Sequence, residues 1–210
     1  MAEPSNPELL TLHSLRLKGF IDAAEAAELA GLEPAIVEAN LATFSEQGLV
    51  IHREGRVSGW QLTADGRAAG EAMLAAELDA SGARDAVAGA YQRFLESNQS
   101  FLSICTDWQV RDIDGEQALN DHTDAGYDAG VIDALSGIDE KVQPIVADLA
   151  AALDRFESYG PRFTDRLAKV KSGDTDWFTK PMIDSYHTVW FELHENLLAT
   201  LGIERAKEGH

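Results

Sequence analysis

Two histidines near the C-terminal end of the chain have the residue type and spacing that could support chemistry. His187 and His194 are seven residues apart, and this spacing places two side chains on the same face of a helix. Trp190 lies between them and Asp184 lies about one turn earlier, so polar and aromatic groups share one stripe. Two imidazoles on one face can ligate a divalent metal ion when a third ligand comes from elsewhere. His122 or Asp121, in the polar segment Asn120-Asp121-His122, is the natural third ligand.

Two other interpretations of this stripe stay open. His187 could accept or donate a hydrogen bond to an acid such as Asp107 or Asp121 and tie a loop to the helix, because buried polar groups need partners. Alternatively, the polar segments could fold over the helix and close a pocket for an organic ligand. Such a pocket would be lined by aromatic, charged and hydrogen-bonding side chains from both regions: Asp107, Trp108, Arg111, Asp121, Tyr186, His187 and Trp190. A divalent metal is thus one of three alternatives, and the sequence requires no cofactor.

Nucleophilic catalysis and nucleotide chemistry have no support in the motifs. The chain has no phosphate-binding glycine loop, no Gly-x-Gly-x-x-Gly and no His-Glu-x-x-His. Ser185 is two residues from His187 and therefore points to a different side of a helix. Cys105 closes an apolar helix face, which is typical of a core cysteine. A metal-dependent enzyme is therefore the least favoured class of function.

The elements before residue 80 have clear local signals. Leucines from Leu9 to Leu17 form one apolar face of a helix that ends near Gly19, and a second helix is expected over 23–30 with Asp22 as its cap. A third helix begins at Pro34 and ends before Gly48. The spacing of apolar residues then changes from that of a helix to that of a strand, which predicts two short strands, 49–51 and 57–62. A further helix follows towards residue 80.

Within this region the chain resembles the MarR-type bacterial winged helix-turn-helix. The matching pieces are Leu29-Ala30-Gly31-Leu32, then Glu46-Gln47-Gly48-Leu49-Val50, and finally Leu62-Thr63-x-x-Gly66-Arg67. The resemblance covers about a third of the chain. It implies a winged helix whose third helix reads the major groove while the wing contacts the DNA backbone.

The candidate DNA-binding residues are basic or hydrogen-bonding side chains: Arg16, Lys18, Asn40, Thr43, Arg53 and Arg56. The third helix itself has no Arg or Lys and has Glu33, Glu38 and Glu46 at or near its ends. Glutamates that face phosphates are repelled. A winged helix used for protein contact is therefore an equally good interpretation.

Beyond residue 80 almost all of the chain is predicted to be helical. Helices are expected over 84–105, from about 124 to 135, over 139–159, up to 170 and over 183–201, with a long polar loop over 106–123 and a break at Gly160-Pro161. The sequence therefore predicts a mostly α protein with a winged helix-turn-helix over 1–80 and a helical bundle of no recognised family over 81–210. The bundle would sense a ligand or mediate dimerisation.

Composition and charge narrow the classes of partner. The chain has 210 residues and a formal net charge of −19, which disfavours broad affinity for nucleic acid or an anionic membrane. The single cysteine suits a reducing compartment. The N-terminal residues lack the features of a signal peptide, and no apolar run is long enough to span a membrane. These features predict a cytoplasmic protein without a membrane partner.

The sequence supports two functions equally. The first is a transcriptional regulator that binds DNA as a dimer and responds to a small-molecule effector. The second is an accessory module that has lost DNA affinity and binds a protein partner or a second copy of itself. The charge on the surface of the third helix and the wing discriminates between them.

Overall fold

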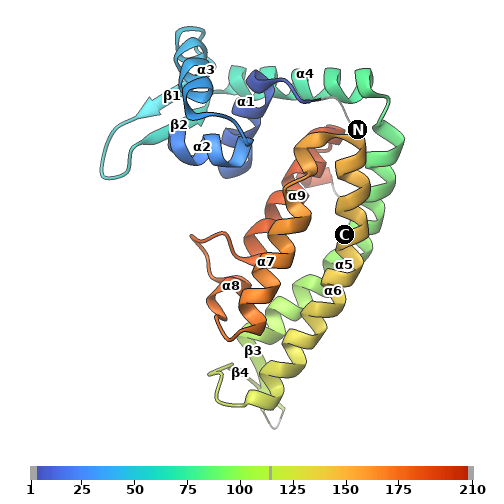
Figure 1. Cartoon of the computed structure of the whole chain (residues 1–210). Helices are drawn as coiled ribbons and strands as arrows, with labels where there is room; N and C mark the ends of the chain where they lie inside the picture. The colour runs from blue at the N-terminus through green and yellow to red at the C-terminus, as the bar shows by residue number, and fades with distance from the viewer. Residues whose placement is uncertain (1–3, 114, 208–210) are drawn as a thin grey trace. The chain divides into compact units, whose positions relative to one another are not determined.

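The computed structural model describes residues 4–113 and 115–207, and these residues are mostly α-helical, as predicted (Figure 1). The strands form two separate two-stranded antiparallel sheets. The contacts divide the chain into two compact units. Unit 1 takes in the chain up to Asp85, Ala152–Arg155 and the chain from His194 onward, and unit 2 takes in Ala86–Ala151 and Phe156–Leu193. The chain is therefore not divided by one boundary near residue 80, because two later segments pack within unit 1.

The first part of unit 1 has the expected order of elements. They are α1 (Pro7–Lys18), α2 (Ala23–Ala30), α3 (Pro34–Glu46), β1 (Val50–Arg53), β2 (Gly59–Leu62) and α4 (Ala64–Ser81). Side-chain caps fix the starts of three of these helices, and Asn6 caps α1 by accepting a hydrogen bond from the Glu8 N–H. Asp22 accepts a hydrogen bond from the Glu25 N–H, and Thr63 accepts one from the Gly66 N–H. These caps satisfy amide groups that have no partner within the helix.

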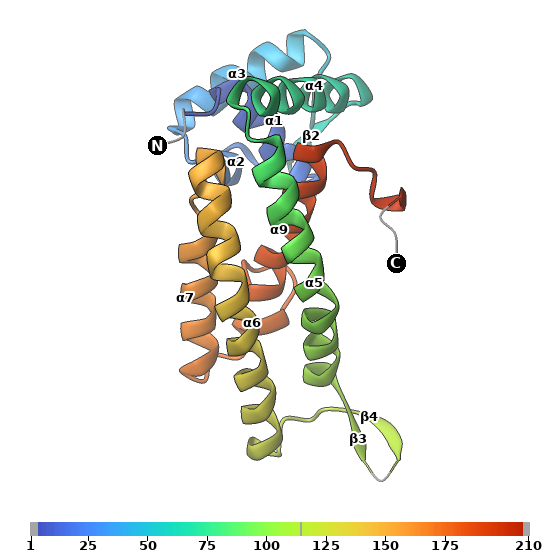
Figure 2. The same ribbon diagram turned by 90° about the vertical axis from the view of Figure 1, so that its right-hand side faces the viewer.

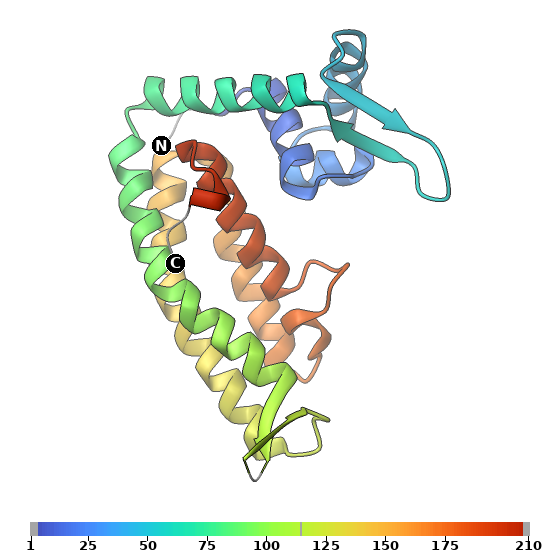
Figure 3. The same ribbon diagram turned by 180° about the vertical axis from the view of Figure 1, so that it is seen from behind.

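The β1–β2 hairpin projects from these helices, as Figure 3 shows in cyan. Its register pairs Val50 with Leu62. Ile21 forms an isolated antiparallel bridge with Trp60, because its backbone N–H and C=O both bond to Trp60, at 3.1 and 2.8 Å. The hairpin is thereby fastened to the segment between α1 and α2.

Gly66 lies where α4 passes close to the backbone of Leu49, just before β1. A Cβ atom at this position would lie 1.8 Å from the carbonyl oxygen of Leu49. Gly70, one turn later, has room for a Cβ at 3.6 Å from that of Leu12. The first glycine is therefore required for packing and the second is not.

Segments from the C-terminal part of the chain complete unit 1. Arg155 bonds through Nε to Glu77 at 2.8 Å, through Nη2 to Thr200 at 2.8 Å, and through Nη1 to Asn196. Its side chain is 2% exposed. Leu9, Leu74 and Ala199 form a small apolar cluster. The first 85 residues therefore share their core with the last helix, α9 (Tyr186–Leu201).

His13 is buried in unit 1 in its neutral form. Burial lowers its pKa from 6.5 to about 3, and the charges of Arg155 and Arg16 act in the same direction. Neither ring nitrogen has a hydrogen bond of good geometry among the described residues, although the Asn196 side chain lies near and partly opposes the decrease in pKa. Protonation of this ring would place a third cation beside two arginines.

We expect His13 to make stability depend on pH. Below about pH 6.5 the unfolded chain protonates this residue while the folded chain does not, so the free energy of unfolding falls as the pH falls towards 3, by up to about 1.4 kcal/mol per pH unit. Urea unfolding between pH 7 and pH 5 should show a flatter dependence for His13→Leu than for the wild type. His52→Leu, at an exposed position, is the control and should keep the wild-type slope. Equal slopes for the wild type and His13→Leu would contradict the assignment.

Unit 2 is built from long helices (Figure 2). Its elements are α5 (Arg84–Gln109), β3 (Val110–Ile113), β4 (Glu116–Leu119), α6 (Ala125–Ala152), α7 (Tyr159–Lys171), α8 (Asp176–Thr179) and the first part of α9, and short 3₁₀ turns lie at Asp154–Phe156 and Arg205–Lys207. Aromatic rings from α5, α7 and α9 meet in its core. Phe101 packs against Trp190 with ring centroids 4.3 Å apart, and Phe163 packs against Tyr186 at 4.8 Å.

Three sequence predictions for this unit were wrong. The segment 106–123 is not one loop, because α5 continues to Gln109 and a hairpin follows. The expected break between 135 and 139 is absent from α6, which contains Pro144. Gly160 and Pro161 lie in the first turn of α7, where a proline is tolerated because its missing N–H would have no helical partner.

No helix within the described residues is long and apolar enough to cross a bilayer.

Candidate functional site

The outward surface of α3 is acidic and apolar. Its exposed residues, which we call the α3 face, are Glu33 (the cap), Pro34, Ala35, Ile36, Glu38, Ala39, Ala42, Thr43, Ser45 and Glu46. The inward residues Val37, Leu41 and Phe44 belong to the core of unit 1. The α3 face therefore presents three carboxylates and no cation.

Three of the predicted DNA-binding residues have partners within the unit. Arg16 forms an ion pair with Glu71 at 2.7 Å, and its side chain is only 13% exposed. Asn40 donates through Nδ2 to Thr11 Oγ1 at 3.0 Å and to the Pro7 carbonyl at 3.3 Å. Thr43 donates to the carbonyl of Ala39 at 3.1 Å. Asn40 and Arg16 thus stabilise the packing around α1. Lys18 is exposed at the end of α1.

The β1–β2 hairpin carries the other predicted cations. Arg53 and Arg56 are both exposed, and neither takes part in an ion pair with another described residue. Glu54 lies between them, and His52 stacks on Trp60 with centroids 4.6 Å apart. Two arginines and one glutamate give the hairpin an excess of one positive charge, opposite in sign to the α3 face.

The predicted ligand-binding residues fall into two groups. The first group lies where α5, the β3–β4 hairpin and the start of α6 meet. Asn120 is its anchor, because its side-chain amide donates to the Trp108 carbonyl at 3.2 Å and to Asp128 Oδ1 at 2.8 Å. His122 Nδ1 lies 3.0 Å from Asp128 Oδ2. Both amide hydrogens of Asn120 are used, so we assign a proton to His122 Nδ1, which donates to Asp128.

Packing and charge complete this first group. The Trp108 ring is buried and contacts His122 at 4.3 Å and Phe178 at 5.0 Å between centroids. Arg111 lies 3.5 Å from Asp124 and over the ring of Tyr127.

Two aspartates contribute to the same region in different ways. Asp107 takes part through its backbone carbonyl, which accepts a hydrogen bond from the Tyr127 hydroxyl at 2.9 Å. Asp121 accepts from the Thr123 side chain and backbone, and these bonds lower its pKa. The arrangement matches a hydrogen-bonded anchor for the hairpin.

The second group lies on α9 and belongs to the core. The Tyr186 hydroxyl donates to Asp139 at 3.0 Å, and burial together with this carboxylate raises its pKa. Trp190 Nε1 donates to Asn98 at 2.9 Å. His187 is half-buried beside Phe101, and burial lowers its pKa. The polar segments do not supply these partners, so the prediction that they meet α9 in one cluster is not supported by the described contacts.

The predicted metal ligands are not brought together. Among the residues that the structure describes, no three His, Cys, Asp or Glu side chains converge to hold a metal ion. His122 binds Asp128 and packs on Trp108, His187 lies beside Phe101, and His194 is buried in unit 1. Sharing a helix face was not enough, since each ring is engaged by a different set of neighbours.

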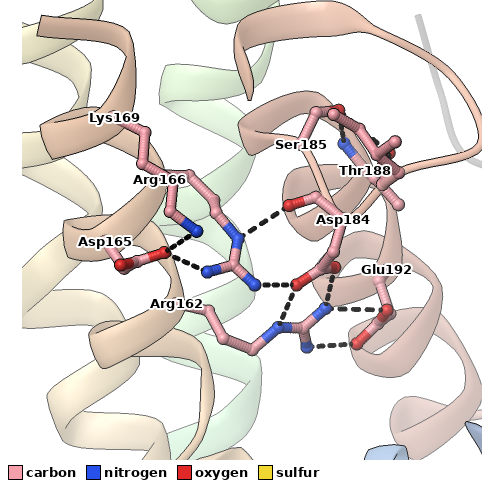
Figure 4. Close-up of polar contacts among 9 residues, drawn as sticks. Arg162, Asp165, Arg166, Lys169, Asp184, Ser185, Thr188 and Glu192 are labelled. Carbon is pink, nitrogen blue, oxygen red and sulfur yellow. Dashed lines mark hydrogen bonds and ion pairs between the residues drawn. The ribbon is translucent and has the colours of Figure 1, made fainter. Parts of the chain in front are cut away.

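A network of ion pairs joins α7 and α9 and was not predicted from the sequence (Figure 4). Arg162 bonds to Asp184 at 2.6 Å and to Glu192 at 2.5 Å. Arg166 bonds to the other Asp184 oxygen and, through Nε, to the Asp184 carbonyl at 2.7 Å. Arg162 and Arg166 are four residues apart and therefore lie on the same face of α7, but the sequence does not indicate that this face packs against α9.

Burial and pairing set the charges of this network. Burial alone would lower the pKa of Arg162, but its hydrogen bonds to Glu192 and Asp184 and their negative charges outweigh burial and raise it. Burial would raise the pKa of Asp184, but Arg162 and Arg166 together lower it. The Glu192 side chain is 3% exposed. Each buried charge thus has a partner, and the network is built to hold α7 on α9.

The thiol of Cys105 is buried. Burial raises the pKa of Cys105 to about 12, so the thiolate is not accessible near neutral pH. This agrees with its expected position in the core.

The exposed side chains of the α3 face and of the β1–β2 hairpin have no role in the packing described above. Comparisons of the chain with protein-family models, with curated proteins and with solved structures find no match, so its function is inferred from these residues alone.

Proposed function

We propose that residues 4–81 form a winged helix and that this domain binds another protein through the α3 face and the β1–β2 hairpin. Support for the winged helix comes from the order of the elements and from the Ile21–Trp60 pairing, which joins the hairpin to the segment after α1. The hairpin is the proposed wing. The helical unit 2 would serve as the scaffold or sensing part of the same chain.

The acidic α3 face is the observation that favours a protein partner over DNA. In a winged helix this face would enter the major groove between two rows of phosphates, where Glu33, Glu38 and Glu46 would be repelled. Phosphate contacts by cations supply most of the non-specific affinity for DNA. Asn40 and Arg16, which could have offset the repulsion, are bound within the unit. Ile36, which is 40% exposed among alanines, suits contact with a protein surface instead.

A DNA-binding experiment tests this choice. We expect the wild-type chain to show no detectable affinity for a fluorescent duplex at about 50 mM salt. The variant E33K/E38K/E46K should acquire salt-dependent affinity for DNA, because it places cations on the helix that would enter the major groove. Its matched control, E96K/D133K/E140K, makes the same change in net charge at exposed positions of unit 2 and should bind much more weakly. Tight binding by the wild type would overturn the protein-binding proposal, and equal binding by both variants would contradict the winged-helix assignment.

A transcriptional regulator is the second candidate, and the exposed arginines of the β1–β2 hairpin favour it. Arg53 and Arg56 are placed where a wing contacts the DNA backbone. If the wild type does bind DNA, R53A/R56A should weaken binding to all sequences alike and reduce the salt dependence by about two phosphate contacts.

A further inference from the structure

We propose that the partner of the α3 face is a second copy of this chain, with the β1–β2 hairpin of each copy lying on the α3 face of the other. The inference rests on the proposed function, because it names the partner of the same surface. The geometry that supports it is the presence of two unpartnered surfaces of opposite charge side by side in one unit.

The charges of the two surfaces are complementary. The α3 face carries Glu33, Glu38 and Glu46 and no cation. The hairpin carries Arg53 and Arg56, which are exposed and have no ion pair among the described residues, and Glu54 offsets only one of them. Within one copy these arginines do not reach the glutamates of α3, so both sets of charges remain available to a second molecule.

The apolar residues of the two surfaces are complementary as well. Ile36 on the α3 face is 40% exposed, and Ile51 and Val57 on the hairpin are 45% and 69% exposed. Apolar side chains ringed by charged ones are typical of protein interfaces. Contact between Ile36 of one copy and Val57 of the other would remove both from water while the surrounding charges set the register.

The position of the two surfaces allows a closed dimer. α3 packs directly against β1, so the acidic and the basic surface are neighbours on the same unit. A two-fold axis between them places each hairpin on the α3 face of the other copy, and every contact then occurs twice. The overall charge of −19 opposes association, but at about 0.1 M salt charges more than about 10 Å apart are largely screened. The charges within the interface therefore affect association more than the overall charge does.

A charge-exchange experiment with the full chain tests this dimer. Analytical ultracentrifugation should show a wild-type dimer. R53E/R56E and E33K/E38K/E46K should each raise the dissociation constant at least roughly tenfold, because each variant places like charges in both halves of the interface. An equimolar mixture of the two variants should form a heterodimer, since the acidic α3 face of one meets the native arginines of the other, and its reversed hairpin meets the lysines.

Three results would overturn the inference: a wild-type monomer up to about 100 μM, a dimer that neither variant weakens, or a mixture that stays monomeric. E96K/D133K/E140K is the control for net charge and should not abolish dimerisation. The DNA-binding experiment separates this failure from failure of the proposed function. A monomer without DNA affinity leaves protein binding intact with another partner, whereas DNA binding by the wild type removes the proposed function itself.

Discussion

Replacing Gly66 by alanine is expected to lower the free energy of unfolding of unit 1 by about 3 kcal/mol. The new Cβ would lie 1.8 Å from the Leu49 carbonyl oxygen. The Cβ is fixed rigidly to the α4 backbone and the oxygen is itself a backbone atom, so neither can move alone. Leu49 also accepts the Thr63 N–H at 3.0 Å and lies next to β1. The clash must therefore displace α4 or the β1–β2 hairpin.

Gly70→Ala is the matched control for this prediction, because the same change in the same helix meets only an ordinary contact at 3.6 Å. It should leave stability unchanged or raise it by up to about 1 kcal/mol through helix propensity. Urea unfolding measures both variants, and hydrogen exchange locates the effect. Protection should fall in residues 4–81 of Gly66→Ala and persist in residues 86–151. Equal stability of the two variants would show that the close approach is not maintained in solution.

Replacing Arg162 by methionine is expected to destabilise unit 2 by about 3–5 kcal/mol, because the substitution removes the guanidinium that forms an ion pair with the buried Glu192 carboxylate. The Glu192 side chain is 3% exposed and lies 2.5 Å from the guanidinium, so water cannot replace the lost partner without opening the contact between α7 and α9. Asp184 retains its ion pair with Arg166, and its side chain is 31% exposed. The loss of its bond to Arg162 therefore costs less stability.

Two further variants separate the buried charge from the loss of packing. R162M/E192L removes both charges and should recover much of the lost stability, since a buried ion pair can often be replaced by apolar groups. Lys180→Met breaks an exposed ion pair with Asp176 and should change stability by less than about 1 kcal/mol. Chemical denaturation of the full chain compares all three. A double variant as unstable as Arg162→Met would mean that the charge of Glu192 is not the cause.

Local signals allowed the first six elements to be predicted from the sequence. Asp22 and Thr63 cap helices as expected, and Gly31 ends α2 in a left-handed conformation that favours glycine. These features act between residues that are close in the chain, so they can be read without knowledge of the fold. The arrangement of unit 2 depends on distant contacts and was predicted less well.

The β3–β4 hairpin was missed although its signal is present. Asp114-Gly115 stands between two runs of four residues, and Asp-Gly is a preferred pair for a two-residue hairpin turn. The runs are too polar to show clear alternation, so the segment resembled a loop.

The α7–α9 network could not be predicted in the same way. Arg162 and Glu192 are thirty residues apart, and nothing in their local sequence specifies that the two helices pack together. The stripe of His187, Trp190 and His194 shows that a correct local pattern does not define a site. Its spacing on the helix was correct, but the neighbours that decide the chemistry come from other elements.

The order in which the parts of unit 1 are synthesised differs from the order in which they are needed. The three helices and the β1–β2 hairpin leave the ribosome first, whereas Arg155 and Ala199 follow after much of unit 2 has been made. Until then Leu9 and Leu74 lack their apolar partner, and Glu77 lacks its cation. The N-terminal region therefore cannot reach its final packing during early translation. Cutting the chain after α4 to isolate this region would create the same unfinished core permanently.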